Sequence, residues 1–210
     1  MVLCRYLGRS CVEIVTDSDH IIIDPNYVEN PRKGINVILL THEHDDHLSE
    51  EKINRINGEF RSKDQKLKIF GPISTIDKVS VEEHIIIEDE SVIELDNGKI
   101  EVFSIDCWKS EACVAYLINV DDKRILHTAD SANYSKRLRT IEKAIDCCFI
   151  ATFEDFYEDY LNFIKTIEPK LTIPYHFSPD KKEMGKNLAT YLEKNDIEVI
   201  YLNPGEEISL

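Results

Sequence analysis

The segment Val37-Ile38-Leu39-Leu40-Thr41-His42-Glu43-His44-Asp45-Asp46-His47 decides how this sequence is interpreted. An apolar run typical of a buried strand is followed at once by three histidines and three acidic residues within seven positions. The loop at the carboxyl end of a strand is the usual place for a functional site in an α/β protein. We therefore expect a chemical function here rather than a solvated polar loop.

The spacing inside this segment favours metal binding. His42 and His44 are two residues apart, so they project to the same side of an extended chain. Asp46 and His47 stand where the chain turns, and they can therefore face a second point in space. Two imidazoles for one cation, with a carboxylate and an imidazole for a neighbouring cation, suit zinc, iron or manganese.

Length and charge limit the possible functions. The 210 residues correspond to about one domain at roughly 150 residues per domain, so we expect a single domain over residues 1–210. There are 40 acidic against 25 basic residues, a formal charge of −15, which argues against nucleic-acid binding because that binding needs clustered lysine and arginine. No apolar stretch approaches the roughly 18–20 residues that a membrane span requires.

The amino terminus and the cysteines indicate the cellular compartment. Arg5, Arg9 and Glu13 interrupt the first apolar segment, which is unlike a signal peptide. We therefore expect a cytoplasmic protein whose six cysteines are reduced thiols and mostly small buried side chains. No pair has the Cys-x-x-Cys spacing of a structural zinc knuckle.

The periodicity of apolar residues predicts a mixed α/β chain. A helix is expected over Ser49–Ile56, with Ser49 as its N-cap and two glutamates in its first turn. Three more helices are expected at Ser135–Ala144, Asp155–Ile167 and Lys181–Lys194. Strands are expected at Leu3–Leu7, Val12–Thr16, His20–Ile23, Asn36–Leu40, Leu67–Phe70, His84–Ile87, Ser91–Leu95, Lys99–Ile105, Cys113–Val120, Arg124–His127, Asp146–Ile150, Leu171–Pro174 and Ile197–Leu202.

The histidine-rich segment resembles the His-x-His-x-Asp-His signature of the metallo-β-lactamase superfamily. Weaker motifs of that family occur in the same order along essentially the whole chain. These are Gly8-Arg9-Ser10-Cys11, Ile21-Ile22-Ile23-Asp24-Pro25, Ile125-Leu126-His127-Thr128-Ala129-Asp130, Ile173-Pro174-Tyr175-His176-Phe177 and Leu202-Asn203-Pro204-Gly205-Glu206. Among the branches of the family, the chain is most similar to small single-domain hydrolases related to the ascorbate-phosphate lactonases.

The resemblance implies a four-layer αββα sandwich of two mixed sheets with outer helices and a binuclear metal site at one edge. By carry-over, His42 and His44 would serve site one, and Asp46, His47 and His176 would serve site two. Asp130 would bridge the two sites. The implied cofactors are two divalent metal ions, with zinc the best candidate and manganese or iron as alternatives.

The sequence departs from the family where site one usually has a third histidine. Here it reads Ile105-Asp106-Cys107-Trp108-Lys109. Cys107 is closest to the expected position, and a thiolate is a competent zinc ligand. Asp106 as the ligand, or a vacant position, are the other possibilities.

Other residues near these motifs have more than one interpretation. Arg9 stands where relatives often have a histidine; it either holds an anionic substrate group or forms a surface salt bridge. The resemblance implies that Asp24 orients a ligand histidine. His127 either supports the site or simply packs in the core. Trp108, Tyr134 and Tyr175 could shape a pocket, but a core role is the default expectation. His20 and His84 are expected to be structural or exposed.

These features together predict a metal-dependent hydrolase. A metal-activated water would attack a small, anionic ester, lactone or phosphoester. Asp46 would orient that water, and His176 would bind metal or transfer a proton. The alternative is a member of the fold that binds metal or ligand without turnover because site one is incomplete; a phosphodiesterase or nuclease is a further possibility. No membrane or nucleic-acid partner is expected, and a homo-oligomer is possible.

Overall fold

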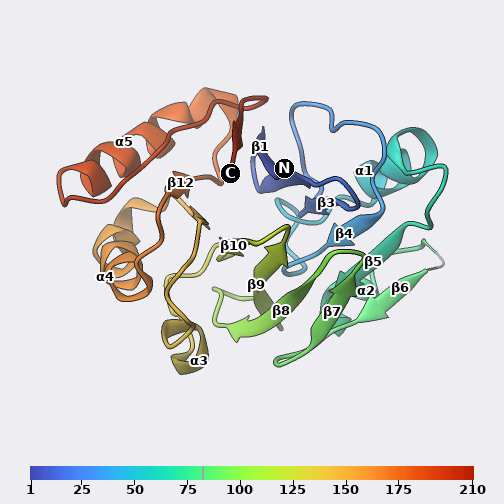
Figure 1. The fold of residues 1–210 in the computed structure, drawn as a ribbon, viewed down its shortest axis with the longest axis horizontal. Coiled ribbons are helices and arrows are strands. Elements are labelled where there is room, and N and C mark those ends of the chain that lie inside the picture. Colours follow the sequence, from blue (N-terminus) through green and yellow to red (C-terminus); the bar gives the residue numbers. More distant parts are fainter. Residues whose placement is uncertain (82) are drawn as a thin grey trace.

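A computed structural model describes residues 1–81 and 83–210, and its strands form two sheets that pack face to face (Figure 1). The first sheet has seven strands in the order β13-β1-β2-β3-β4-β5-β6. Their bounds are Glu207–Ser209, Leu3–Gly8, Cys11–Val15, His20–Ile23, Val37–Leu39, Lys68–Gly71 and His84–Ile86. The second sheet has the order β12-β11-β10-β9-β8-β7. Its bounds are Thr172–Pro174, Cys147–Ile150, Lys123–His127, Cys113–Val120, Gly98–Ile105 and Val92–Leu95.

Both sheets are mixed. In the first sheet the pairs from β13 through β1 and β2 to β3 are antiparallel, whereas the pairs from β3 through β4 and β5 to β6 are parallel. In the second sheet β10, β11 and β12 are parallel, and β7 to β10 form an antiparallel meander. Because parallel strands end at the same edge, the loops after β3 and β4 meet there.

Helices cover the outer faces of the two sheets. They are α1 (Glu50–Arg55), α2 (Ile73–Ile76), α3 (Lys136–Arg139), α4 (Tyr157–Ile167) and α5 (Lys182–Glu193). Figure 1 shows α1 and α2 beside the first sheet and α3 to α5 on the opposite side of the molecule. This arrangement confirms the four-layer αββα sandwich of two mixed sheets with outer helices.

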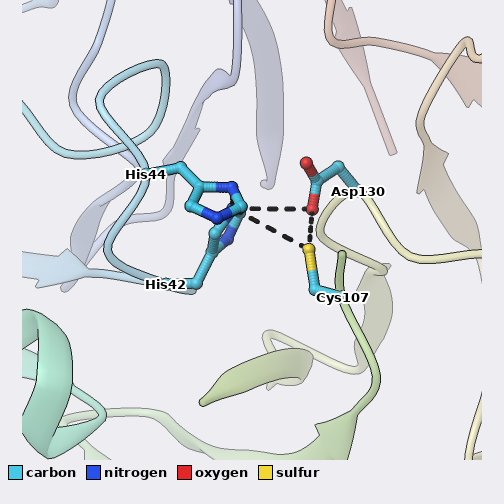
Figure 2. Close-up of side chains that lie close together, drawn as sticks. All are labelled: His42, His44, Cys107 and Asp130. Atoms are coloured by element: carbon cyan, nitrogen blue, oxygen red, sulfur yellow. Dashed lines mark hydrogen bonds and ion pairs between the residues drawn. The ribbon is translucent and has the colours of Figure 1, made fainter. Parts of the chain in front are cut away.

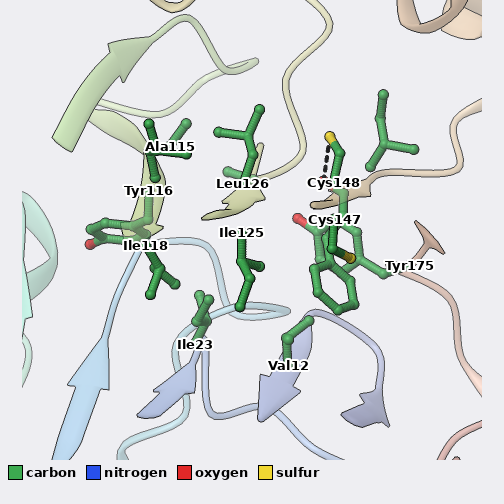
Figure 3. Packing of buried hydrophobic residues seen from close by; sticks show 14 of the residues in the cluster. Val12, Ile23, Ala115, Tyr116, Ile118, Ile125, Leu126, Cys147, Cys148 and Tyr175 are labelled. Carbon is green, nitrogen blue, oxygen red and sulfur yellow. Dashed lines mark hydrogen bonds between the residues drawn. The ribbon is translucent and has the colours of Figure 1, made fainter. Parts of the chain in front are cut away.

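The buried side chains explain why the layers form. In β3, Ile21 and Ile23 point into the cluster between the sheets, while Ile22 faces the separate cluster beneath α1. Figure 3 shows Val12 and Ile23 of the first sheet facing Ile118 and Ile125 of the second. Successive residues of a strand point to opposite faces, so a strand that is apolar at every position is buried on both sides.

The helix expected at Ser49 forms as predicted. Ser49 has extended backbone angles, and its hydroxyl accepts a hydrogen bond from the amide of Lys52. The helix α1 then continues into a π-helical turn over Ile56–Phe60, which brings Ile56 and Phe60 into the cluster beneath the first sheet.

Two predicted elements were wrong in extent. The helix expected over Ser135–Ala144 is only the single turn α3, because the Thr140 hydroxyl bonds back to the carbonyls of Lys136 and Arg137 and ends it. The strand expected over Ile197–Leu202 is reduced to one bridge between Thr172 and Val199. The short elements α2 and β13 were not predicted, since three or four residues carry little periodic signal.

The described part of the chain contains no helix with the length and hydropathy needed to cross a membrane.

Candidate metal centre

The histidine-rich segment forms the loop directly after β4, and a buried carboxylate holds it from below. Asp24, at the end of β3, accepts hydrogen bonds from the amide and the hydroxyl of Thr41 at 2.8 and 2.7 Å. Its Oδ2 also lies 2.7 Å from Nδ1 of His47. Because Nδ1 of His47 is engaged there, its Nε2 is free to face the site. The orienting role expected of Asp24 agrees with this geometry.

The second sheet fixes the same loop from the other side. The Tyr116 hydroxyl donates to the carbonyl of Leu40, and the amide of Val114 donates to the carbonyl of Thr41 at 3.1 Å. Both residues belong to β9. The loop is therefore held between the two sheets, which favours a rigid arrangement of its side chains.

One group of donor atoms comprises His42, His44, Cys107 and Asp130, whose donor atoms all lie within 4.8 Å of one another (Figure 2). Nε2 of His42 is 3.1 Å from Nδ1 of His44 and 3.6 Å from Oδ1 of Asp130. The Cys107 sulfur is 2.7 Å from the same Asp130 oxygen and 3.9 Å from Nε2 of His42. Two imidazoles, a thiol and a carboxylate therefore converge on one point.

A second group comprises Asp46, His47 and His176, whose donor atoms also lie within 4.8 Å of one another. Nε2 of His176 is 3.0 Å from Nε2 of His47 and 3.3 Å from Oδ2 of Asp46. Oδ2 of Asp130 lies 3.5 Å from Nε2 of His47, so the two oxygens of Asp130 face different groups. This is the placement expected of a bridging carboxylate.

The charges in the two groups strongly perturb one another. Burial disfavours a charged His47 ring, but the carboxylates of Asp24 and Asp130 outweigh it and raise the pKa of His47 to about 10. Burial and the neighbouring His47 lower the pKa of His42 to about 4. Although burial alone would raise it, the facing histidines keep the pKa of Asp130 well below its ordinary value. His176 likewise lowers the pKa of Asp46.

The donor set fits divalent metal ions. Nε2 of His47 faces Nε2 of His176 at 3.0 Å, and Nε2 of His42 faces Nδ1 of His44 at 3.1 Å, so two ring nitrogens converge in each group. A cation between such nitrogens, with a carboxylate and a thiolate beside it, is the usual solution in proteins. Imidazole, carboxylate and thiolate together favour zinc, and the group without sulfur also suits manganese or iron.

The geometry distinguishes the alternatives for the residue that replaces the third histidine. Cys107 is half-buried and its sulfur lies within the first group. The Asp106 carboxylate instead accepts a hydrogen bond from Asn133 at 3.0 Å. The other five cysteines are free and buried, as expected.

Glu43, which the sequence did not single out, connects two of the three loops that carry the first group. Its carboxylate accepts hydrogen bonds from the hydroxyl of Ser110 at 2.9 Å and from the amide of Glu111 at 2.7 Å. These residues follow Cys107 in the loop after β8. Glu43 thus fastens the cysteine loop to the histidine loop, and only its place inside the motif could have suggested this role.

Arg9 lies beside the second donor group, whereas His127 lies in the core. Arg9 lines a cavity of about 500 Å³ together with Asp46 and His176. His127 is buried, its ring is tilted against that of Tyr175 with centroids 4.7 Å apart, and burial lowers its pKa to about 4. It packs in the core and, in the part of the chain that the structure describes, belongs to neither donor group.

The solvent exposure of three aromatic and two histidine side chains tests the roles expected for them. Tyr134 and Tyr175 are buried, as predicted, but Trp108 is 77% exposed, so its expected core role was wrong. Lys109 adopts a positive φ of 58° next to it, and this turn directs the indole to the surface beneath the Lys109 ammonium. His20 is buried against Glu13, and His84 is exposed.

Comparison with known proteins places this arrangement in context. A family model described as "Beta-lactamase superfamily domain" matches residues 4–176. A UPF0173 metal-dependent hydrolase of Enterococcus faecalis is 26% identical over 96% of both chains. A second protein of that name, from Pyrococcus horikoshii, is 25% identical over the full length of both chains.

Solved structures show the same fold at lower sequence identity. The metallo-beta-lactamase fold protein YhfI from Bacillus subtilis superposes with a TM-score of 0.82 at 14% identity, over all of both chains. Igni18, a metallo hydrolase from Ignicoccus hospitalis, superposes with a TM-score of 0.75 at 17% identity, over 99% of this chain and 97% of its own.

Proposed function

Because the chain belongs to the beta-lactamase superfamily, we propose that it is a metal-dependent hydrolase that acts on a small molecule. The scissile group is an ester, a lactone or a phosphoester, and the substrate carries an anionic group. We further propose that the residues 1–210 work as one domain and that the centre uses two divalent metal ions.

The observation that carries the proposal is the convergence of seven donor side chains in two adjoining groups. His42, His44, Cys107 and Asp130 would hold one ion, and Asp46, His47 and His176, with Asp130 between the groups, would hold the other. The thiolate of Cys107 favours zinc at the first position, where a hard ion such as manganese is a poor match. When bound, the two ions supply Lewis acidity, which activates a water and stabilises negative charge on the substrate oxygen.

Three side chains at the cavity would take the other roles in hydrolysis. The Asp46 carboxylate is half exposed to the cavity and ionised, so it can accept a hydrogen bond from the attacking water and aim the oxygen. His176 faces the same cavity, 3.3 Å from Asp46, and is placed either as a ligand or as the donor of a proton to the leaving oxygen. Arg9 lines that cavity as well, where its guanidinium suits an anionic substrate.

Binding of metal or ligand without turnover is the competing function. It would follow from a vacant first position, but the Cys107 sulfur lies within reach of both His42 and Asp130. The geometry therefore supports a complete donor set and favours the enzyme.

The proposal is tested by a hydrolysis screen on purified protein. Nitrophenyl carboxylate esters, nitrophenyl phosphate, small lactones and a generic phosphodiester are assayed before and after treatment with a chelator, and again after addition of zinc or manganese. We expect turnover of an ester, lactone or phosphomonoester that is lost with chelator and restored by metal. Metal-dependent thermal stabilisation without turnover of any substrate would support the binding function instead, and cleavage of the phosphodiester alone would support a nuclease.

A further inference from the structure

The cavity beside the second donor group contains two cationic side chains, which come from opposite ends of the chain. Arg9 lies in the tight turn between β1 and β2, and Lys181 lies directly before α5. Asp46 and His176 form the side of the cavity nearest the metal centre. The cavity has about 500 Å³, within the range of small-molecule sites, and it opens next to the reacting groups.

Neither cation forms an ion pair in residues 1–81 and 83–210. Acidic residues outnumber basic ones 40 to 25, and most of the arginines form ion pairs, for example Arg5 with Glu13 and Arg137 with Asp89. Within the described chain, Arg9 donates to an amide oxygen and Lys181 makes no ion pair. Asp46 and Asp180 are the two carboxylates at this cavity, and neither forms an ion pair with Arg9 or Lys181. Two cations in this position beside the candidate centre are a feature that a bound anion would explain.

A buried amide holds the Arg9 side chain in place. Nη1 of Arg9 donates to Oδ1 of Asn26 at 3.0 Å, and Nδ2 of Asn26 donates to the carbonyl of Asp45 at 2.8 Å. Asn26 is 4% exposed, so the amide that holds Arg9 is itself buried, whereas the Arg9 side chain is open to solvent. The amide of Arg9 also donates to the carbonyl of Phe177 at 2.8 Å. The guanidinium is therefore fixed relative to the metal-binding loop and to the segment that bears His176.

The rest of the cavity wall is apolar. Phe153, Phe177 and Met184 line it, and the Phe153 ring lies 5.0 Å from the ring of His176. Aromatic and thioether side chains provide a surface for a hydrocarbon part of a ligand. The cavity thus offers a reacting end at Asp46 and His176, an apolar surface, and a cationic end.

We propose that this cavity binds a substrate whose anionic oxyacid group, a carboxylate or a phosphate, is held by Arg9 and Lys181 while a short hydrocarbon segment lies against Phe153 and Met184. The inference rests on the proposed function and deepens it, because it names the part of the substrate that gives specificity. Asp180 lies at the same cavity, with its carboxylate held by Ser178 at 2.6 Å, and its charge limits the anion that the site accepts.

The test is direct binding, measured by isothermal titration calorimetry on the metal-loaded protein. Three probes are used: 3-phenylpropionate, phenyl phosphate and the neutral 3-phenylpropanamide. We expect the better of the two anions to bind at least about tenfold more tightly than the amide, since charge-assisted hydrogen bonds are the strong ones. Whichever anion binds more tightly identifies the oxyacid group.

Variants then assign the binding to the two cations. Arg9→Gln and Lys181→Gln should each weaken anion binding about tenfold and leave amide binding unchanged. Lys182→Gln is the matched control. It removes the same charge at the next residue, and the Lys182 side chain does not line the cavity. Asp180→Asn should strengthen anion binding. Anion affinity that is equal to amide affinity, or that falls no more in the two cavity variants than in Lys182→Gln, would overturn the proposal.

The anion-binding proposal and the hydrolase proposal can fail independently of each other. If anion binding depends on Arg9 and Lys181 but no substrate is hydrolysed, the cavity assignment stands and the enzyme assignment fails. If esters are hydrolysed with metal and kcat/KM falls equally for anionic and neutral esters in Arg9→Gln, the enzyme stands and the anion site is wrong.

Discussion

Asp24 and His47 form a buried pair in which Oδ2 of the aspartate lies 2.7 Å from Nδ1 of the histidine, and neither side chain is exposed to solvent. This contact fixes the imidazole ring so that its Nε2 faces His176 and Asp130. The orientation of His47 in the second donor group therefore depends on a residue that is not itself a member of either group.

Replacing Asp24 with asparagine is expected to weaken metal binding without unfolding the protein. Asparagine has the same shape and tolerates the positive φ of 46° found at this position. It lacks the charge that favours a metal-ligating imidazole, so we expect zinc affinity to fall about 10- to 100-fold. Competition with a chromophoric chelator measures the affinity, and circular dichroism of the metal-free variant checks the fold. Unchanged affinity would mean that the pair is only structural.

Cys107 is expected to be a metal ligand with a spectroscopic signature. Substituting cobalt for zinc should give intense near-ultraviolet absorption from thiolate-to-metal charge transfer, because Cys107 is the one cysteine within the donor groups of the described chain. The band should disappear in Cys107→Ser. Cys113→Ser is the control, since Cys113 is buried and belongs to neither group. A band that survives in Cys107→Ser would show that the thiol does not bind the metal.

The donor residues on the histidine loop could be predicted because they are nearly consecutive and follow a buried strand. Asp130 and His176 could be found only through resemblance to a family, since nothing local marks them. Asn26 and Lys181 were missed because their roles depend on contacts between distant segments. A single sequence contains no signal for such contacts.

The errors in the predicted secondary structure also arise from features that the apolar spacing of a single sequence does not reveal. Leu138, Ile141 and Ile145 have the spacing of a helix face and all contact the core. Local hydrogen bonds of Thr140 end the helix, however, and the chain must then turn to enter β11. Trp108 was expected in the core because it is large and apolar, but the loop that brings Cys107 to the centre directs the indole outward.

Glu13 is expected to make the stability of the protein depend on acid pH. Burial would raise its pKa, but hydrogen bonds from His20 and the Arg32 amide, with Arg5 nearby, lower it below the ordinary 4.5. A lowered pKa contributes stability in full above the unfolded value and loses it as the pH falls through the folded value. At pH 7, Glu13→Gln should reduce the unfolding free energy by about 2 kcal/mol.

The pH profile separates this charge effect from a loss of packing. In urea unfolding, the difference between the wild type and Glu13→Gln should shrink below about pH 4.5 and disappear as Glu13 protonates. Glu207→Gln is the control, because its ion pair with Arg32 is largely exposed and should contribute little. A difference that stays constant down to about pH 3 would contradict the assigned role of the charge.

Gly185 in α5 is expected to be intolerant of alanine. Alanine normally stabilises a helix interior by about 1 kcal/mol relative to glycine. Here an added Cβ would lie 2.5 Å from Cε1 of Phe177, whose ring is buried against Tyr201. We therefore expect Gly185→Ala to destabilise the protein by about 1–3 kcal/mol in thermal unfolding. Alanine at the exposed Gly58, where nothing lies within 4 Å, should not destabilise.

The central claim is that two adjoining groups of side chains hold two metal ions, and metal content tests it most directly. Protein purified without chelator and reconstituted with zinc is analysed by elemental mass spectrometry, together with Cys107→Ala and His176→Ala. We predict two ions per chain in the wild type and one in each variant, because each variant disrupts one group. One ion or none in the wild type and the same in Cys107→Ala would contradict the account.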